Sequence, residues 1–325
     1  MFLHEHPEFE SLIENTAREL DIKNIGLVEK DYWIMHSLWV LQQNKFNFHL
    51  KGGTSLSKGF NCIHRFSEDI DIHIEPQEKQ CGFKVYTNKN QDKKSYQNES
   101  RKLFFDWITK TLNENSYGLL NAEREEEFDD PSGKYKNGGI RLHYNSIFPS
   151  IEGLKKGILL EVWFGKIAPN QPTNISSWAY KKAASIPNLA LTDNRAYNVV
   201  CYEPKYTFVE KLQAIIRKFR LYKEQDKNST LPQNFIRHYY DLYQLIDRDD
   251  VKEFIATDEY NDFKKDHFGT RDDIVIKNSE AFKLSDPQDR KIFDDAYIRS
   301  ENLYYKGRPS FQQILDRINQ DIERL

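Results

Sequence analysis

Two short patterns in this sequence hold the residue types that bind a metal ion and a phosphate chain. The first is a glycine-containing run made of Lys51, Gly52, Gly53, Thr54 and Ser55. The second is Asp69-Ile-Asp71, which fourteen residues separate from Thr54. Because the two acids alternate with isoleucines, they project from one face of a predicted strand and can hold a divalent cation together.

The glycine pair predicts a tight turn into a new helix, which Thr54 is expected to cap. Such a turn lets backbone N–H groups approach phosphate oxygens at the positive end of the helix dipole. Nucleotidyl transfer needs a phosphate site beside a metal site, because metals bridge the triphosphate and activate the attacking hydroxyl. Either pattern alone is more often structural. The two in this order favour nucleotidyl transfer.

A third acid, Glu161, lies in the run 158–164, which is otherwise apolar on both faces. A strand of this kind belongs to the interior of a sheet, where an unpaired carboxylate is costly. We expect Glu161 to complete a metal site with Asp69 and Asp71. The alternative is a structural salt bridge between Glu161 and an arginine.

The elements that position these residues follow from the spacing of apolar side chains. The first part of the chain alternates between the two periods, with helices expected at 7–20, 27–41 and 99–112 and strands at 69–75, 140–144 and 157–164. The polar residues 77–99 are expected to form a mobile surface insertion. From residue 203 onward the period is helical, with further helices at 249–264, 288–300 and 308–323. We therefore predict an α+β fold, with a mixed α/β domain over residues 1–200 and a helical bundle over residues 201–325.

Composition excludes several classes of protein. The 325 residues are 38% hydrophobic and 14% aromatic, which excludes wholesale disorder. A net charge of −3 gives the whole chain no strong bias toward nucleic acid or membrane. Three scattered cysteines favour neither a disulfide framework nor a cysteine-rich zinc site. The sequence shows no signal peptide and no membrane span, so we expect a cytoplasmic protein without a membrane partner.

Five segments together resemble one family of bacterial toxins. KGGTSLSKGF and RFSEDIDI resemble the signature of the polymerase-beta-like nucleotidyltransferase superfamily. With the segments 29–33, 208–217 and 237–243, the chain is similar to the AbiEii/AbiGii toxin family of abortive-infection and type IV toxin–antitoxin systems. The resemblance covers residues 27–245.

The resemblance implies a polymerase-beta-like domain and a helical bundle with the active site between them. Lys211 matches a lysine that completes the cleft in the family, and Asp241 matches an acid there. His238 stands where the family often has another acid. From the sequence alone, Asp241 could also pair with Arg237, one helical turn away, and Lys211 could be a solvated lysine.

The family's activity implies that Mg²⁺ (or Mn²⁺) is the cofactor and an NTP the substrate. It further implies RNA as the acceptor, in particular the 3′ end of tRNA, and a cognate antitoxin as the protein partner. Two alternatives stay open. One is transfer of a nucleotide to a small molecule or a protein, and the other is binding of NTP or RNA without turnover.

Charge is segregated in the second half of the chain. Residues 205–223 hold six basic residues against one acid, whereas residues 247–290 hold thirteen acids against eight bases. We expect Lys211 to contact the triphosphate and Arg217, Lys218 and Arg220 to extend that surface toward RNA.

Overall fold

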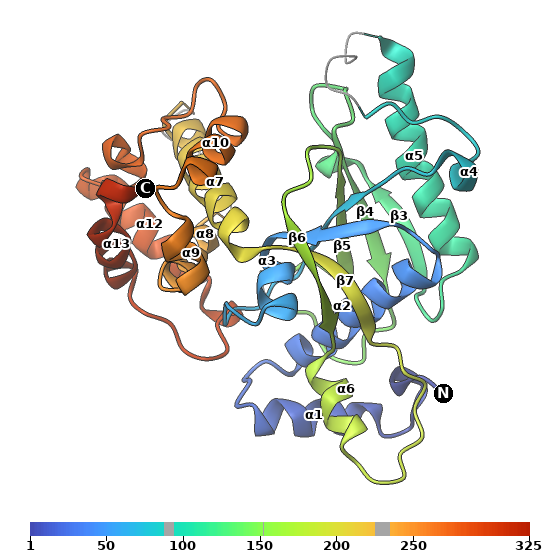
Figure 1. The fold of residues 1–325 in the computed structure, drawn as a ribbon. Coiled ribbons are helices and arrows are strands. Elements are labelled where there is room, and N and C mark those ends of the chain that lie inside the picture. The colour runs from blue at the N-terminus through green and yellow to red at the C-terminus, as the bar shows by residue number, and fades with distance from the viewer. Residues whose placement is uncertain (88–93, 152, 225–234) are drawn as a thin grey trace. The chain divides into compact units, whose positions relative to one another are not determined.

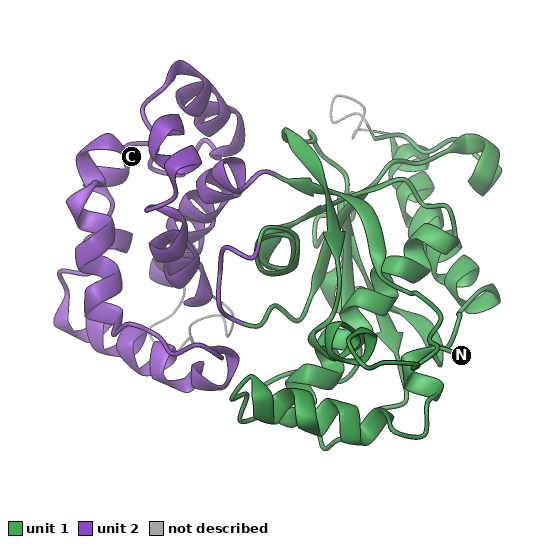
Figure 2. Cartoon of the chain, turned by 60° about the horizontal axis from the view of Figure 1, so that its bottom comes forward, with its two compact units in different colours: residues 1–60, 66–202 green, residues 61–65, 203–325 purple. Residues whose placement is uncertain are grey.

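The computed structural model describes residues 1–87, 94–151, 153–224 and 235–325. Two compact units account for this part of the chain (Figures 1 and 2). Unit 1 comprises residues 1–60 and 66–202, and unit 2 comprises residues 61–65 and 203–325. The short segment 61–65 therefore joins unit 2 although both of its flanks belong to unit 1.

Unit 1 is built on a mixed seven-stranded sheet with the order β3-β4-β5-β2-β1-β7-β6. Its strands are β1 (Phe48–Lys51), β2 (Ile70–Ile74), β3 (Asn121–Glu125), β4 (Asn137–His143), β5 (Ile158–Trp163), β6 (Asn170–Ile175) and β7 (Ala196–Tyr202). Strand β2 runs parallel to β5 and antiparallel to β1, and β1 runs parallel to β7. The predicted α+β class is confirmed.

The two faces of the central strands differ in chemistry. On β2, Ile70, Ile72 and Ile74 are buried on one face, and Asp71 points to the other. Strand β5 is flanked by β4 and β2, so the prediction of an interior strand is confirmed. Figure 1 shows the long helices α2 and α5 on one side of the sheet.

The helices of unit 1 include one that is buried on nearly every side. They are α1 (Phe9–Glu19), α2 (Ile25–Gln43), α3 (Gly52–Thr54), α4 (Glu78–Cys81), α5 (Ser95–Glu114) and α6 (Trp178–Ala184). Fifteen of the nineteen residues of α2 are buried, which is typical of a helix inside a domain. The expected mobile insertion contains α4 and the start of α5, and its residues 88–93 lie outside the described part of the chain.

Unit 2 is helical. Its helices are α7 (Pro204–Glu224), α8 (Arg237–Leu245), α9 (Asp249–Phe254), α10 (Asp258–His267), α11 (Glu280–Lys283), α12 (Pro287–Arg299) and α13 (Phe311–Gln320). Its core is aromatic: the ring of Tyr239 lies 5.3–6.1 Å from four phenylalanine rings, those of Phe235, Phe282, Phe293 and Phe311.

Sequence periodicity does not predict three of the strands, and it predicts a single helix where the structure has two. β3, β6 and β7 were not predicted, because β3 and β6 are polar edge strands and β7 buries only part of each face. The single helix expected at 249–264 is two helices, α9 and α10, separated by Ala256 with a φ of +67°. Within the described residues, no helix is both long and apolar enough to cross a membrane.

Candidate active site

The turn between β1 and α3 is built around Gly52. Strand β1 ends at Lys51, and α3 begins at the next residue. Gly52 has a φ of +71°, and a Cβ atom placed on it would lie 2.1 Å from Oδ2 of Asp71. Only glycine therefore lets this backbone lie against the carboxylate of β2. After Thr54 the helix continues as the π-helical turn η2 (Ser55–Gly59), a geometry that recurs at functional sites.

The two hydroxyl side chains of the turn point into the protein. Thr54 does not cap the helix as predicted, because the helix already begins at Gly52; its Oγ1 donates instead to the carbonyl oxygen of Asp69, at 2.5 Å. Ser55 Oγ donates to the carbonyl oxygen of Tyr202, at 3.3 Å. Both hydroxyls thus fix the turn to neighbouring strands. The first backbone N–H groups of a helix have no partner within it, and phosphate binding by those of this turn stays a prediction.

The register of the sheet aligns the acids of the predicted site. Asp71 stands opposite Lys51 of β1 on one side and Glu161 of β5 on the other. Glu161 in turn faces Gly139 of β4. Because residues opposite each other in a sheet share a face, Asp71 and Glu161 are neighbours. Asp69 precedes Asp71 by two residues, which is the spacing of side chains on one face of a strand.

Glu161 has carboxylates for neighbours instead of a cation of its own. Burial, then the charges of Asp71 and Asp69, raises the pKa of Glu161 to about 9, and the charge of Lys51 opposes the shift. In its protonated form Glu161 donates a hydrogen bond to Asp71. The Lys51 ammonium lies 3.8 Å from the centroid of the Trp163 ring. Within the described residues no arginine pairs with Glu161, so the structural salt bridge is not its role.

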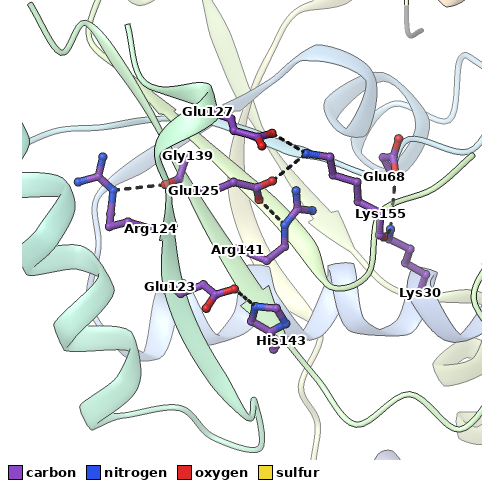
Figure 3. Close-up of polar contacts among 10 residues, drawn as sticks. All are labelled: Lys30, Glu68, Glu123, Arg124, Glu125, Glu127, Gly139, Arg141, His143 and Lys155. Carbon is purple, nitrogen blue, oxygen red and sulfur yellow. Dashed lines mark hydrogen bonds and ion pairs between the residues drawn. The ribbon is translucent and has the colours of Figure 1, made fainter. Parts of the chain in front are cut away.

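The acids at the β3–β4 edge of the same sheet are, in contrast, compensated by bases (Figure 3). Glu125 accepts from Arg141 Nε at 2.5 Å and from Lys155 Nζ at 2.9 Å. Desolvation opposes ionisation of Glu125, but these hydrogen bonds outweigh it, so its pKa is lowered. Glu123 accepts from His143 at 2.7 Å. This cluster is a set of structural ion pairs.

The three carboxylates fit a divalent cation by their chemistry. Carboxylate oxygens are the ligands that Mg²⁺ and Mn²⁺ prefer. Without a metal, the proton on Glu161 that is hydrogen-bonded to Asp71 reduces the negative charge of the pair, as a bound cation would. Among the residues that the structure describes, no three acids, histidines or cysteines are already gathered around a common metal position. The predicted adjacency of Glu161 and Asp71 is present. Metal coordination by Asp69, Asp71 and Glu161 stays a prediction.

Lys211 and Asp241 lie together in unit 2. Asp241 is buried and accepts two hydrogen bonds from Arg65, at 2.6 and 2.7 Å. Lys211 Nζ lies 3.3 Å from Oδ2 of Asp241. Desolvation raises the pKa of Asp241, but the charges of Arg65 and Lys211 outweigh it and hold that pKa below its ordinary value. The bidentate partner is thus 176 residues away, whereas the sequence offered Arg237 one turn away.

A comparison with known families decides the identity of the fold. The model of the family described as "Nucleotidyl transferase AbiEii toxin, Type IV TA system" matches residues 33–317. The chain belongs to this family. Among proteins with curated descriptions, none matches it. The chain is therefore a nucleotidyltransferase and the toxin of a type IV toxin–antitoxin system, with a nucleotide substrate and an antitoxin partner.

The AbiEii match begins just after three consecutive charged residues of α2 that are all buried. Each of the three holds a different segment of unit 1. Their shortest contacts are Glu29 with the backbone N–H of Ile147 (2.8 Å), Lys30 with the carbonyl of Lys155 (2.7 Å) and Asp31 with the ammonium of Lys58 (2.6 Å).

Two of these three charged residues contact segments that adjoin the predicted site. Lys58 belongs to η2, the turn that follows the glycine pair, so Asp31 anchors that turn to α2. Lys30 also pairs with Glu68, 3.5 Å away and next to Asp69 (Figure 3). Sequence reasoning attached residues 29–33 to the AbiEii family only by resemblance. The available signal was three adjacent charges on a helix that is otherwise apolar all round.

The basic stretch of the AbiEii chain on α7 differs from expectation. Arg220 Nη2 lies 2.9 Å from Asp272, and Lys223 Nζ lies 2.8 Å from Asp289. The acids of 247–290 therefore neutralise part of the charge on α7, and the segregation seen in the sequence is partly lost in the fold. Three aromatic residues that lie between these bases in the sequence, Tyr206, Phe208 and Phe219, are buried, while Arg217 is exposed.

Proposed function

We propose that this toxin transfers a nucleoside monophosphate from an NTP to the 3′ end of RNA, with tRNA as the acceptor. The observation that carries the proposal is the Asp71–Glu161 pair beside the Gly52 turn. Its negative charge has only partial compensation from Lys51, and it lies next to a turn that can approach phosphate. A cytoplasmic reaction follows, because NTP and tRNA are found there.

Each residue of the predicted site has a proposed role. Asp69, Asp71 and Glu161 hold a divalent cation, Mg²⁺ or Mn²⁺. When bound, such a cation neutralises triphosphate charge and lowers the pKa of the attacking hydroxyl. The backbone of Gly52, Gly53, Thr54 and Ser55 lies along the phosphates, and Lys51 adds a positive charge beside them.

Lys211 supplies positive charge to the triphosphate, and Asp241 orients it. The geometry of unit 2 supports this division of roles, because Arg65 already holds both oxygens of Asp241. The ammonium of Lys211 is therefore attached to a fixed acceptor, which limits its motion. That Lys211 and Asp241 of unit 2 act on the same triphosphate as the three acids of unit 1 is part of the proposal.

The test uses purified protein, Mg²⁺, total tRNA and each of the four NTPs labelled at the α-phosphate. We expect label in RNA with one or two of the NTPs. Periodate treatment of the tRNA destroys the terminal diol and should abolish labelling. Label that persists after periodate would contradict transfer to the 3′ end. Label in a protein or in an added aminoglycoside, with none in RNA, would support the alternative acceptors.

A further inference from the structure

Lys58 has little access to water, although it lies on the turn that follows the glycine pair. Its side chain is 11% exposed, and its ammonium lies 2.6 Å from Oδ1 of Asp31, whose side chain is 1% exposed. Desolvation lowers the pKa of the Lys58 ammonium, and the charge of Asp31 opposes part of that shift. The far end of η2 is therefore held to α2 by a buried ion pair.

The second oxygen of Asp31 holds another helix. Oδ2 accepts the backbone N–H of Trp178, the first residue of α6, at 2.7 Å. The first N–H groups of a helix have no partner within it, so this carboxylate satisfies one of them. Each oxygen of Asp31 thus has a partner, and the side chain joins three elements: α2, η2 and α6.

Three side chains fix the turn to different parts of unit 1. Thr54 holds its beginning through the carbonyl oxygen of Asp69. Ser55 adds a hydrogen bond to the carbonyl oxygen of Tyr202 on β7. Lys58 holds its end through the ion pair with α2. Because a π-helical turn is a rare backbone geometry, the shape of η2 depends on these contacts with its surroundings.

A buried ion pair contributes less to stability than its short distance suggests. Taking two charges out of water is costly, and the attraction between them repays little more than that cost. An apolar pair of similar volume would therefore serve the stability of unit 1 about as well. The directed hydrogen bonds of an ion pair do more to select one arrangement of the chain.

We propose that Asp31 and Lys58 are positioning residues that hold the turn 52–59 in the form that binds the triphosphate of the NTP. Neither side chain has to touch the substrate. The pair keeps the backbone N–H groups of the turn in place before the NTP arrives, so that binding does not have to order them. This inference rests on the proposed function, in which the turn lies along the phosphates.

The experiment replaces both members of the pair, as Asp31→Asn with Lys58→Met. The asparagine oxygen can still accept from the N–H of Trp178, and no charge is left unpaired. The urea midpoint of unfolding, followed by tryptophan fluorescence, should stay the same or rise. Calorimetric titration with Mg²⁺ and each of the four NTPs, without RNA, should show binding at least about tenfold weaker than in the unmodified protein.

Enzyme kinetics separate positioning from a structural role. In the transfer assay the double variant should raise KM for the NTP more than it lowers kcat, because the turn binds phosphate and the acids hold the metal. A smaller folded fraction would instead lower kcat per mole of protein and leave KM unchanged. Lys58→Arg keeps the charge at this position and should retain most of the affinity for NTP.

The matched control is a second ion pair of unit 1, Arg124 with Asp129, 2.6 Å apart and with side chains 13% and 14% exposed. Asp129→Asn with Arg124→Met should leave NTP affinity unchanged. Equal weakening of NTP binding by both double variants would overturn the inference, because the effect would not depend on the turn.

Gly52→Ala distinguishes this inference from the proposed function, because it disturbs the turn directly. If Gly52→Ala weakened NTP binding and the Asp31/Lys58 double variant did not, the positioning role would be wrong and the phosphate site would stand. If neither variant weakened NTP binding, the phosphate site at this turn would be wrong as well. Weaker binding in both, with the control unchanged, would support the positioning role.

Discussion

Two clusters of charged side chains, one in each unit, differ in how their charge is compensated. In unit 1, Asp71 and Glu161 are adjacent acids, and burial together with the charges of Asp71 and Asp69 raises the pKa of Glu161. In unit 2, the buried carboxylate of Asp241 is held by Arg65 and Lys211, whose charges keep its pKa below the ordinary value. Matched charges of this kind hold the fold together. Adjacent acids cost stability, so they indicate where a cation is expected.

The largest expected effect tests the matched pairs. Asp241→Asn removes the buried carboxylate that Arg65 and Lys211 both contact, so unit 2 should lose about 3–5 kcal/mol of its free energy of unfolding. Far-UV circular dichroism during urea unfolding measures this, because unit 2 is helical. The control is Asp250→Asn, which breaks a bidentate but exposed pair with Arg248 and should cost less than about 1 kcal/mol. Equal losses of unfolding free energy in the two variants would contradict the difference between buried and exposed ion pairs.

The second effect tests the acids of unit 1. Asp71→Asn should lower nucleotide transfer by at least about 10²-fold, because the carboxylates stabilise charge that develops on phosphate through the bound cation. Asp69→Asn should act in the same direction. Transfer is measured with labelled NTP at equal folded fraction. Glu123→Gln, which changes only the pair with His143, should keep full activity. Normal transfer by Asp71→Asn would show that these acids are not catalytic.

The third effect compares two glutamates on one sheet face. In chelator, the native state keeps the proton of Glu161 up to pH about 9, whereas the unfolded chain releases it near 4.5. The native state then binds more protons, so this group lowers stability as pH rises between those values, by up to about 1.4 kcal/mol per pH unit. Glu161→Gln should therefore become more stable than the unmodified protein as pH rises.

Glu125→Gln should do the opposite. The pKa of Glu125 is lowered, so its stabilisation is present above the unfolded value of 4.5 and is lost as pH falls. The variant should be less stable at pH 7 by about 1 kcal/mol, and the deficit should shrink below pH 4.5. Tryptophan fluorescence follows unit 1 alone, because all five tryptophans lie in it. If the unfolding free energies of Glu161→Gln and Glu125→Gln changed with pH in the same way, the predicted difference between the two glutamates would be wrong.

The smallest effect concerns the rim of α7. Arg217 is exposed, whereas Arg220 is held by Asp272 and Glu224. If RNA follows this helix, Arg217→Ala should reduce the slope of log affinity against log salt by about one unit, and Arg220→Ala by less. RNA titrations at several salt concentrations measure both slopes. If the salt dependence of RNA affinity had the same slope in both variants and in the unmodified protein, RNA would not bind along α7.

The sequence predicts which residues share a face, but not which strands become neighbours. Alternation places Asp69 and Asp71 on one polar face of a strand, and Glu161 is the isolated acid of a strand that is otherwise apolar on both faces. Their adjacency depends on the pairing of β2 with β5, which brings residues far apart in the chain together. Periodicity within a strand contains no information about this register.

Local rules also fail where tertiary contacts compete with them. A cap at Thr54 is a sound expectation from residue type, but the turn at Gly52, with its positive φ, makes Lys51 the cap and starts the helix three residues earlier. Helical spacing suggests Arg237 as a partner for Asp241, and a residue from another segment, Arg65, takes that place. The acids that neutralise α7 likewise come from elements far along the chain.

The segment 61–65 has a consequence for how the chain is made. Arg65 leaves the ribosome 176 residues before Asp241, a delay of about 10–35 s at ordinary rates of synthesis. The remainder of unit 1, residues 66–202, is synthesised within that interval, before the acid that Arg65 binds in unit 2 exists. A gene cut between residues 202 and 203 would therefore not yield two self-sufficient proteins. Its second product would carry Asp241 without the guanidinium that holds it.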